Sequence, residues 1–318
     1  MAKINNQNNN ELMIRPNFLK QGDTIGIAAT ARKISSIELK PAIDKLSEWG
    51  LKVVFADNID KADNQFAGND ELRAKSFQSL LDDDNISAII CGRGGYGTVR
   101  IIEKLDFTKF SKKPKWIIGY SDVTVLHTYI HQKLGIETMH ATMPINFSYN
   151  GKDTISTDSL KSALFGKAPQ YNDIEGNERN IIGNTDGILV GGNLSVLYSV
   201  RGTSFDLDTD GKILFIEDLD EYLYHIDRMI WNLKVSGKLS KLKGLIVGGM
   251  TNMSDNLVPF GKDACEIISE AVSEYNYPVC FEFPVGHKEP NIALIMGRKI
   301  DLIVEKEKVQ LKFSDRSS

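Results

Sequence analysis

Short apolar runs alternate with helical periods in the first half of the chain. Each run has the length of a buried strand, and in the intervening segments apolar residues recur about one helical turn apart, as Ile43, Leu46 and Trp49 do. Strands that alternate with helices predict a parallel sheet with helices on both faces, whose active site lies at the carboxyl ends of the strands. Strands are expected at 23–29, 51–56, 86–92, 115–120 and 136–141, and helices at 34–50, 69–84, 96–106 and 122–135.

The second half mixes strands and helices in a less regular order. Residues 150–185 are polar and interrupt the pattern, whereas residues 292–313 have alternating apolar positions with short breaks. Such alternation is typical of antiparallel strands. Further strands are expected at 187–192, 212–218, 244–250 and 277–283, and helices at 195–200, 221–234 and 262–275.

A length of 318 residues fits about two domains of ~150 residues. We expect a α/β protein with a second, mixed domain. The expected boundaries are a disordered tail at 1–14, an α/β domain at 15–165, a linker at 166–185 and a C-terminal domain at 186–318.

Charge and composition argue against several function classes. Lys and Arg number 38 against 42 Asp and Glu, so the net charge is −4, which disfavours a nucleic-acid partner. No apolar run approaches the ~20 residues that cross a bilayer, and the Asn-rich N-terminus lacks the apolar core of a signal peptide. The three cysteines form no close pair. We therefore expect a cytoplasmic protein without disulfides or a membrane partner.

Ser121 stands where a predicted strand runs directly into a predicted helix. A sharp turn of this kind exposes a serine hydroxyl above the sheet, and the N–H groups that start the helix point at a developing oxyanion. The hydrolase pattern G-x-S-x-G is matched only in part, because position 123 is Val. The alternative is structural, since Ser or Asp before a helix is often an N-cap.

A glycine-rich turn follows the third predicted strand. Gly92, Gly94 and Gly97 match the dinucleotide fingerprint G-x-G-x-x-G. That fingerprint usually follows the first strand, however, and only Asp122 supplies the acid expected ~20 positions further on. The same glycine N–H groups could donate to an oxyanion beside Ser121, or the glycines could serve a tight turn.

An acid and a histidine complete the candidate set. Glu217 stands at the end of a predicted strand and, unlike the acids after it, is not needed to cap the next helix. His287 lies in a polar turn between two predicted strands, where a histidine is often merely exposed. His127 and His131, four residues apart on one predicted helix, could bind a metal, but they lack the Glu of H-E-x-x-H.

Together these residues form the parts of a Ser–His–acid triad with an oxyanion hole. The chain order is Ser121, Glu217, His287, and the triad is defined by geometry and not by order.

The chain resembles the murein tetrapeptide LD-carboxypeptidases, a serine peptidase family that also includes the microcin C immunity peptidases. The resemblance covers most of the chain and implies an α/β N-terminal domain, a C-terminal domain with a β-barrel-like core, and a site between the two. It also implies a homodimer and no metal or organic cofactor. The matching motifs, in the order of the family, are RGGYGTVRIIEKLDF, IIGYSDVTVLH, GGNLSVL, FIEDLDE and GHKEPNIALIMG.

The resemblance also implies roles for individual residues. Ser121 would be the nucleophile, Glu217 the acid and His287 the base. Backbone N–H groups of Gly95 and Asp122 would form the oxyanion hole. The implied reaction is release of the terminal D-alanine from the L,D-linked tetrapeptide of cytoplasmic murein precursors, either the small peptide or its UDP-linked form, through an acyl-enzyme.

A carboxypeptidase must also bind a free carboxylate, for which Arg is the usual bidentate partner. Arg93 and Gly94 in the glycine-rich turn, and Asn193 after a strand end, are the candidate substrate-binding residues. A purely structural role is the alternative for Arg93 and Asn193.

Three competing functions remain open at this point. The first is hydrolysis of peptidyl-nucleotide antibiotics by the same triad. The second is a nucleotide-binding, Rossmann-like protein that uses the glycine-rich turn, for which a nucleotide would raise the melting temperature. The third is a non-catalytic binding module, which is disfavoured because all three triad residue types are present.

Overall fold

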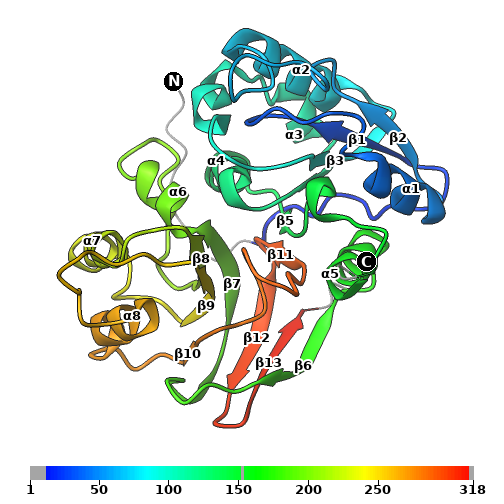
Figure 1. Ribbon diagram of the computed structural model, residues 1–318. Coiled ribbons are helices and arrows are strands. Elements are labelled where there is room, and N and C mark those ends of the chain that lie inside the picture. The colour runs from blue at the N-terminus through cyan, green and yellow to red at the C-terminus, as the bar shows by residue number, and fades with distance from the viewer. Residues whose placement is uncertain (1–11, 152–153, 315–318) are drawn as a thin grey trace, which may run out of the picture.

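The computed structural model describes residues 12–151 and 154–314, which form two β-sheets with associated helices (Figure 1). The first sheet has the strand order β11-β5-β4-β3-β1-β2. Strands β1 to β5 are parallel, as the alternation of apolar runs and helices predicts. Their bounds are β1 Thr24–Ala28, β2 Lys52–Phe55, β3 Ile86–Cys91, β4 Trp116–Ile118 and β5 Thr138–His140.

Local sequence signals mark where the helices of this half begin. Pro41 lies in the first turn of α1, where its missing N–H needs no partner. The Asn69 side chain caps α2 by accepting the Leu72 N–H at 2.9 Å. The helices are α1 Lys40–Glu48, α2 Asp70–Asp82, α3 Thr108–Lys112, α4 Thr124–Leu134 and α5 Thr154–Leu164.

The helix expected at 96–106 is instead a pair of short 3-10 turns. Tertiary partners take the backbone groups that would start a regular helix. The Gly97 carbonyl accepts a hydrogen bond from the buried Arg73 at 2.9 Å, and the Thr98 N–H donates to the Asp122 carboxylate at 2.9 Å. The two turns are η1 Thr98–Arg100 and η2 Ile102–Lys104.

The second sheet is mixed and has the strand order β10-β9-β8-β7-β12-β13-β6. Strands β7 to β10 are parallel, whereas β7, β12, β13 and β6 pair antiparallel. Helices α6, α7 and α8 follow β7, β8 and β9 and pack against them (Figure 1). The bounds are β6 Gln170–Glu175, β7 Gly183–Asn193, α6 Leu194–Ser199, β8 Ile213–Leu219, α7 Leu223–Val235, β9 Gly244–Thr251, α8 Ala264–Val272, β10 Val279–Cys280, β12 Lys299–Val304 and β13 Lys308–Phe313.

Within the described residues this second sheet is open, not the barrel-like core that the family resemblance implies. The segment after β6 reaches β10 through a single bridge, in which Ile181 and Val279 exchange hydrogen bonds of 2.9 and 3.0 Å. The next rung is missing because the Asn180 side chain, and not a strand carbonyl, accepts the Phe281 N–H at 2.9 Å. The hydrogen-bond ladder is therefore not continuous around the sheet, and the sheet does not close into a barrel.

The segment expected as a linker, 166–185, contains strand β6 and the start of β7. Its sequence is polar overall, but Tyr171 and Ile174 pack against the buried apolar core. The Tyr171 hydroxyl also donates to the Ala293 carbonyl at 2.7 Å. Two anchoring residues are enough to hold an otherwise exposed edge strand.

The tail expected at 1–14 is not disordered at its end, because Ile14 pairs with the segment that leads into β5. Ile14 forms a parallel bridge with Ile136, and its N–H donates to the Gly135 carbonyl at 2.6 Å. Residues 1–11 lie outside the described part of the chain.

Strand β11 (Leu294–Met296) joins the two sheets. It pairs antiparallel with β5 at the edge of the first sheet, and the chain then enters β12 of the second. Between these strands Arg298 forms an ion pair with Glu137, with Nη2 and Nε at 2.6 and 3.1 Å from Oε2. Their side chains are 3% and 0% exposed. The antiparallel segment expected at 292–313 is thus divided between both sheets.

The apolar core is continuous across the two sheets. One buried cluster contains Ile27 and Met139 from the first sheet together with Phe215 and Leu302 from the second. In the described part of the chain, no helix combines the length and apolarity that a bilayer crossing requires.

Three histidines are buried near the Ser121 junction. His127 and His131 lie on α4, and His140 ends β5. Burial lowers the pKa of His127 to about 4, that of His131 to about 3, and that of His140 well below its usual value of 6.5. Both ring nitrogens of His140 lack a hydrogen-bond partner among the described residues. All three rings are therefore neutral in the fold.

These histidines should make the fold sensitive to acid. Below pH 6.5 the unfolded chain takes up protons that the folded rings cannot, so the free energy of unfolding falls as the pH drops from about 7 to about 4. The loss should reach several kcal/mol, on the order expected for two or three such groups. Urea denaturation at a series of pH values measures it, and His131→Leu should flatten the pH dependence. A free energy of unfolding that stays constant between pH 7 and 4.5 would contradict this account.

The buried ion pair should be needed for stability. Arg298→Met removes the cation that is paired with the buried Glu137, and loss of one member of a buried ion pair typically costs ~3–5 kcal/mol. Replacing both residues, with Arg298→Met and Glu137→Leu, should recover much of that loss because no lone charge remains. Equilibrium urea denaturation of the single and double variants tests this. A single variant within ~1 kcal/mol of the wild type would show that the pair contributes little.

Candidate active site

Ser121 lies at the junction between β4 and α4. The chain leaves β4 through Gly119, and Ser121 takes a left-handed backbone conformation with φ 62°, which is strained for a residue other than glycine. The short turn η3 (Ser121–Val123) then leads into α4, and Ser121 caps neither element. Ser121 is 9% exposed, and its hydroxyl has no hydrogen-bond partner among the described residues. The turn therefore presents an uncommitted hydroxyl at the carboxyl edge of the sheet.

The glycine-rich turn after β3 lies against this serine. A Cβ added to Gly94 would come within 2.9 Å of the Ser121 Cβ and 3.0 Å of its Oγ, so only glycine allows this approach. Gly95 has φ 118°. The backbone N–H groups of Gly95 and Asp122 have no acceptor among the described residues. The Asp122 N–H directly follows Ser121 in the chain, and the Gly95 N–H directly follows Gly94, which contacts Ser121.

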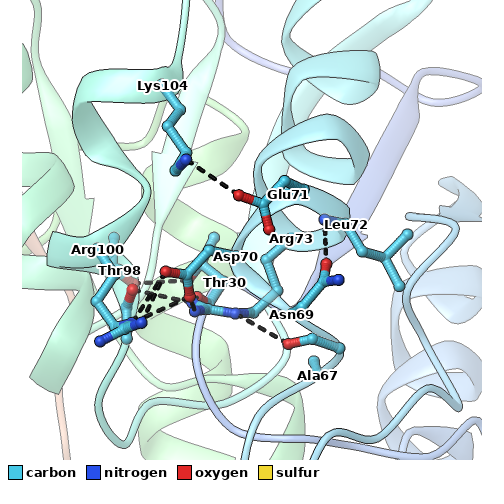
Figure 2. Close-up of polar contacts among 12 residues, drawn as sticks. Thr30, Ala67, Asn69, Asp70, Glu71, Leu72, Arg73, Thr98, Arg100 and Lys104 are labelled. Atoms are coloured by element: carbon cyan, nitrogen blue, oxygen red, sulfur yellow. Dashed lines mark hydrogen bonds and ion pairs between the residues drawn. The ribbon is translucent and has the colours of Figure 1, made fainter.

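A polar cluster centred on Arg73 holds the far side of this turn. Arg73 is fully buried and donates to the backbone carbonyls of Thr30 and Gly97 at 2.5 and 2.9 Å. Its guanidinium also pairs with Asp70, which Arg100 contacts from the other side at 2.9 Å (Figure 2). The end of the glycine-rich turn is therefore fixed to α2 and to the loop after β1.

Asp122 connects the turn to the serine. Its buried carboxylate accepts the Thr98 N–H at 2.9 Å. Burial raises the pKa of Asp122, and the Thr98 and Gly97 hydrogen bonds oppose that effect. The carboxylate is thus committed to the protein's own backbone. The ribose contact that the dinucleotide alternative requires of this acid is not available.

Glu217 and His287 are in direct contact, although they come from different elements of the C-terminal half. Glu217 lies near the end of β8 and is 0% exposed, and His287 lies in the loop between β10 and β11. The His287 Nδ1 is 2.6 Å from Glu217 Oε2, and the His287 backbone N–H donates to the same oxygen at 3.1 Å. A carboxylate can only accept, so Nδ1 carries the proton and Nε2 is left as an acceptor.

This contact depends on Gly286. A Cβ at that position would lie 2.6 Å from Glu217 Oε2, and the backbone has φ 104°. On the other side the Tyr120 ring packs on the imidazole, with ring centroids 4.8 Å apart. The orientation of the His287 ring is thus set by a hydrogen bond and an aromatic neighbour.

A cavity of about 290 Å³ brings residues from both sheets together. Ser121 and His287 both line it, although no hydrogen bond joins their side chains. Arg32 and Asp220 are lining residues that the sequence-based prediction lacks. Arg32 could have been found, because it follows β1 in a loop at the carboxyl edge of the sheet, where sites of such folds lie. The lining residues are Arg32, Arg93, Gly94, Gly95, Tyr120, Ser121, Met143, Ile145, Asn146, Leu219, Asp220 and His287.

Asn193 lies outside this lining. Its side-chain oxygen accepts the Val196 N–H at 3.1 Å and caps α6, while its Nδ2 donates to Asp218 at 2.9 Å. Burial, and then the neighbouring Glu217 charge, raises the pKa of Asp218 to about 7. Asn193 and Asp218 thus serve to join α6 to β8.

The pair of histidines on α4 does not form a metal site. His127 Nε2 contacts the Gly119 carbonyl at 2.9 Å, and His131 Nε2 contacts Thr138 Oγ1 at 3.0 Å. Across residues 12–151 and 154–314, no group of three His, Cys, Asp or Glu side chains is arranged to hold a metal ion.

Two sequence profiles match the chain in tandem. Residues 25–141 match the LD-carboxypeptidase N-terminal domain and residues 186–302 match the LD-carboxypeptidase C-terminal domain. The first profile spans the Ser121 junction, and the second contains Glu217 and His287.

Whole-chain comparisons agree with these matches. A probable murein peptide carboxypeptidase of Bacillus subtilis is 35% identical over 294 residues, which cover 91% of each chain. The microcin C7 self-immunity protein MccF of Escherichia coli is 25% identical and covers 92% of this chain and 94% of its own. The crystal structure of muramoyltetrapeptide carboxypeptidase from Oxalobacter formigenes superimposes with a TM-score of 0.83 at 28% identity, covering 93% and 100% of the two chains. The chain therefore belongs to the LD-carboxypeptidase family, Peptidase S66, a family of serine-type hydrolases.

Proposed function

We propose that this protein is a serine carboxypeptidase that releases the terminal D-alanine from L,D-linked murein tetrapeptides. The observation that carries the proposal is the meeting of Ser121 and His287 at one cavity, with the imidazole held by Glu217 at 2.6 Å. The names of the Bacillus subtilis and Oxalobacter formigenes relatives support the choice of a murein peptide as substrate. The substrate can be the free peptide or its UDP-linked precursor, because cleavage takes place at the D-alanine end of the peptide and the UDP group is attached at the other end.

In the proposed mechanism His287 Nε2 takes the Ser121 hydroxyl proton as Oγ attacks the carbonyl carbon before the terminal D-alanine. The oxyanion accepts hydrogen bonds from the N–H groups of Gly95 and Asp122. The protonated imidazole then gives its proton to the leaving amine, and D-alanine departs. A water molecule, deprotonated by His287, hydrolyses the acyl-enzyme and restores the serine.

Glu217 acts on the imidazole and not on the substrate. Its hydrogen bond selects the Nδ1–H tautomer and stabilises the imidazolium that forms after proton transfer. The Glu217 charge stabilises the imidazolium strongly because Glu217 is fully buried, where water screens the interaction little.

The cytoplasm suits this proposal. Cys91 and Cys280 are buried free thiols, and Cys265 is a partly exposed free thiol. Free cysteines are typical of proteins in a reducing compartment.

Hydrolysis of a peptidyl-nucleotide, suggested by the similarity to MccF, is the competing reaction. Among the residues that line the cavity, Tyr120 carries the aromatic ring that could stack a base, but that ring already packs on His287 and His140. We therefore favour the murein peptide. Assaying an aminoacyl sulfamoyl adenosine beside the tetrapeptide separates the two, because faster turnover of the nucleoside would reverse the preference.

Ser121→Ala should abolish D-alanine release while the protein stays folded. Loss of a serine nucleophile can lower kcat by ~10⁶, and the substitution removes one oxygen atom that has no partner in the fold. Chromatographic detection of D-alanine, together with the melting temperature, measures both effects. Ser199→Ala, an exposed serine on α6, is the matched control and should keep full activity. Turnover by Ser121→Ala within tenfold of wild type would rule out this nucleophile.

Glu217→Gln and Asp218→Asn should show that these two adjacent buried acids have different roles. Glu217→Gln should lower kcat by ~10³–10⁴ with little change in KM, because the amide no longer fixes the imidazole tautomer. Asp218→Asn should mainly lower the melting temperature, because Asp218 accepts hydrogen bonds from Asn193 and from the Ser195 N–H. Steady-state kinetics and thermal denaturation of both variants provide the test. Equal losses of kcat in the two would remove the special role of Glu217.

A further inference from the structure

We propose that Arg32 binds the terminal carboxylate of the substrate. The inference rests on the carboxypeptidase function proposed above and names the group that recognises the end of the peptide. Arg32 lies in the loop after β1 and lines the same cavity as Ser121 and His287.

The Arg32 side chain lies close to the reaction centre. A Cβ added to Gly95 would come within 2.4 Å of Arg32 Cγ and Cδ, so the arginine stem rests on the Gly95 backbone. The adjacent Gly94 is in the same close contact with Ser121. Arg32 is thus separated from the serine by the width of the glycine-rich turn. In a carboxypeptidase the free carboxylate lies a few bonds from the scissile carbonyl, so its binding group must lie this near the nucleophile.

The backbone of Arg32 is anchored, but its charge is not used by the fold. Arg32 forms an antiparallel bridge with Phe66, and the flanking Lys33 N–H donates to the Gln65 carbonyl at 2.9 Å. The Arg32 guanidinium is exposed and makes no hydrogen bond or ion pair with any described residue. A cation held in place without a partner is suited to an anionic ligand, and guanidinium binds carboxylate with two parallel hydrogen bonds.

Arg93, the arginine expected from the sequence, is engaged elsewhere. Its Nη1 donates to the Lys33 carbonyl at 3.3 Å, and its charge acts on Glu38 in the same loop. Arg93 therefore holds the segment that carries Arg32, and it adds to the positive potential of the cavity. The carboxylate contact itself is assigned to Arg32.

The charges along the cavity give the substrate a direction. Arg32 and Arg93 come from loops of the first sheet, whereas Asp220 comes from the loop after β8 in the second sheet. Asp220 is exposed and has a left-handed backbone, with φ 55°. An anionic terminus is attracted to the arginines and repelled by the aspartate. The terminal D-alanine is thereby directed to the glycine-rich turn beside Ser121.

The test compares two substrates on four proteins. The substrates are a murein tetrapeptide with a free D-alanine carboxylate and the same peptide ending in D-alanine amide. The proteins are wild type, Arg32→Gln, Arg32→Lys and Lys33→Gln. Lys33 is the matched control, since it is adjacent, equally charged and outside the cavity lining.

Arg32→Gln should lower kcat/KM for the free acid by roughly 10- to 100-fold, the range of a charge-assisted hydrogen bond, and leave the amide substrate nearly unchanged. Arg32→Lys should recover only part of the loss, because a lysine keeps the charge but not the paired geometry. Lys33→Gln should behave as wild type. Equal losses on both substrates, or none on either, would overturn the assignment.

A binding measurement separates this inference from the proposed function. Calorimetry of Ser121→Ala, with and without Arg32→Gln, compares the affinities for the acid and the amide. Tighter binding of the acid that depends on Arg32, combined with no turnover by the wild type, would support the carboxylate site and refute the reaction. Affinities that do not depend on Arg32, combined with normal D-alanine release by the wild type, would refute the site and leave the reaction standing.

Discussion

The ion pair between Arg298 and Glu137 is the constraint that fastens the two sheets to each other. Both side chains are almost completely buried, so each charge stabilises the other in a place that water does not reach. Glu137 precedes β5 of the first sheet, and Arg298 precedes β12 of the second sheet. Because Ser121 belongs to one sheet and Glu217 to the other, the relative position of the candidate catalytic groups depends on this seam.

The two adjacent acids at the end of β8 have different partners because they lie on opposite faces of the strand. Successive side chains of a strand point to opposite faces. Glu217 therefore meets His287 on one face, while Asp218 on the other accepts hydrogen bonds from Asn193 and the start of α6. The same strand end thus positions His287 and secures the helix beside it. Burial, and then the adjacent Glu217 charge, raises the pKa of Asp218.

The parallel sheet and the Ser121 junction could be predicted from the sequence because both depend on local pattern. Apolar runs defined β1 to β5, and the same pattern placed Ser121 between a buried strand and a helix. Strand β11 could not be separated from β12, since alternating apolar residues do not show which sheet they join. The position of Arg32 after β1 places it at the carboxyl edge of the sheet, but its proposed role could not be predicted. Its importance comes from contact with Gly95, which is distant in sequence, and no local pattern distinguishes it from the neighbouring Lys33.

The pairing of β11 with β5 has a consequence for how the chain folds during its synthesis on the ribosome. The first sheet lacks its outer strand until residues 294–296 have been synthesised. Until then β5 presents an unpaired edge, which is a site for wrong partners. His287 also arrives late, only a few residues before β11. A nascent chain therefore contains Ser121 long before it contains His287, and the candidate site is complete only once both have been synthesised.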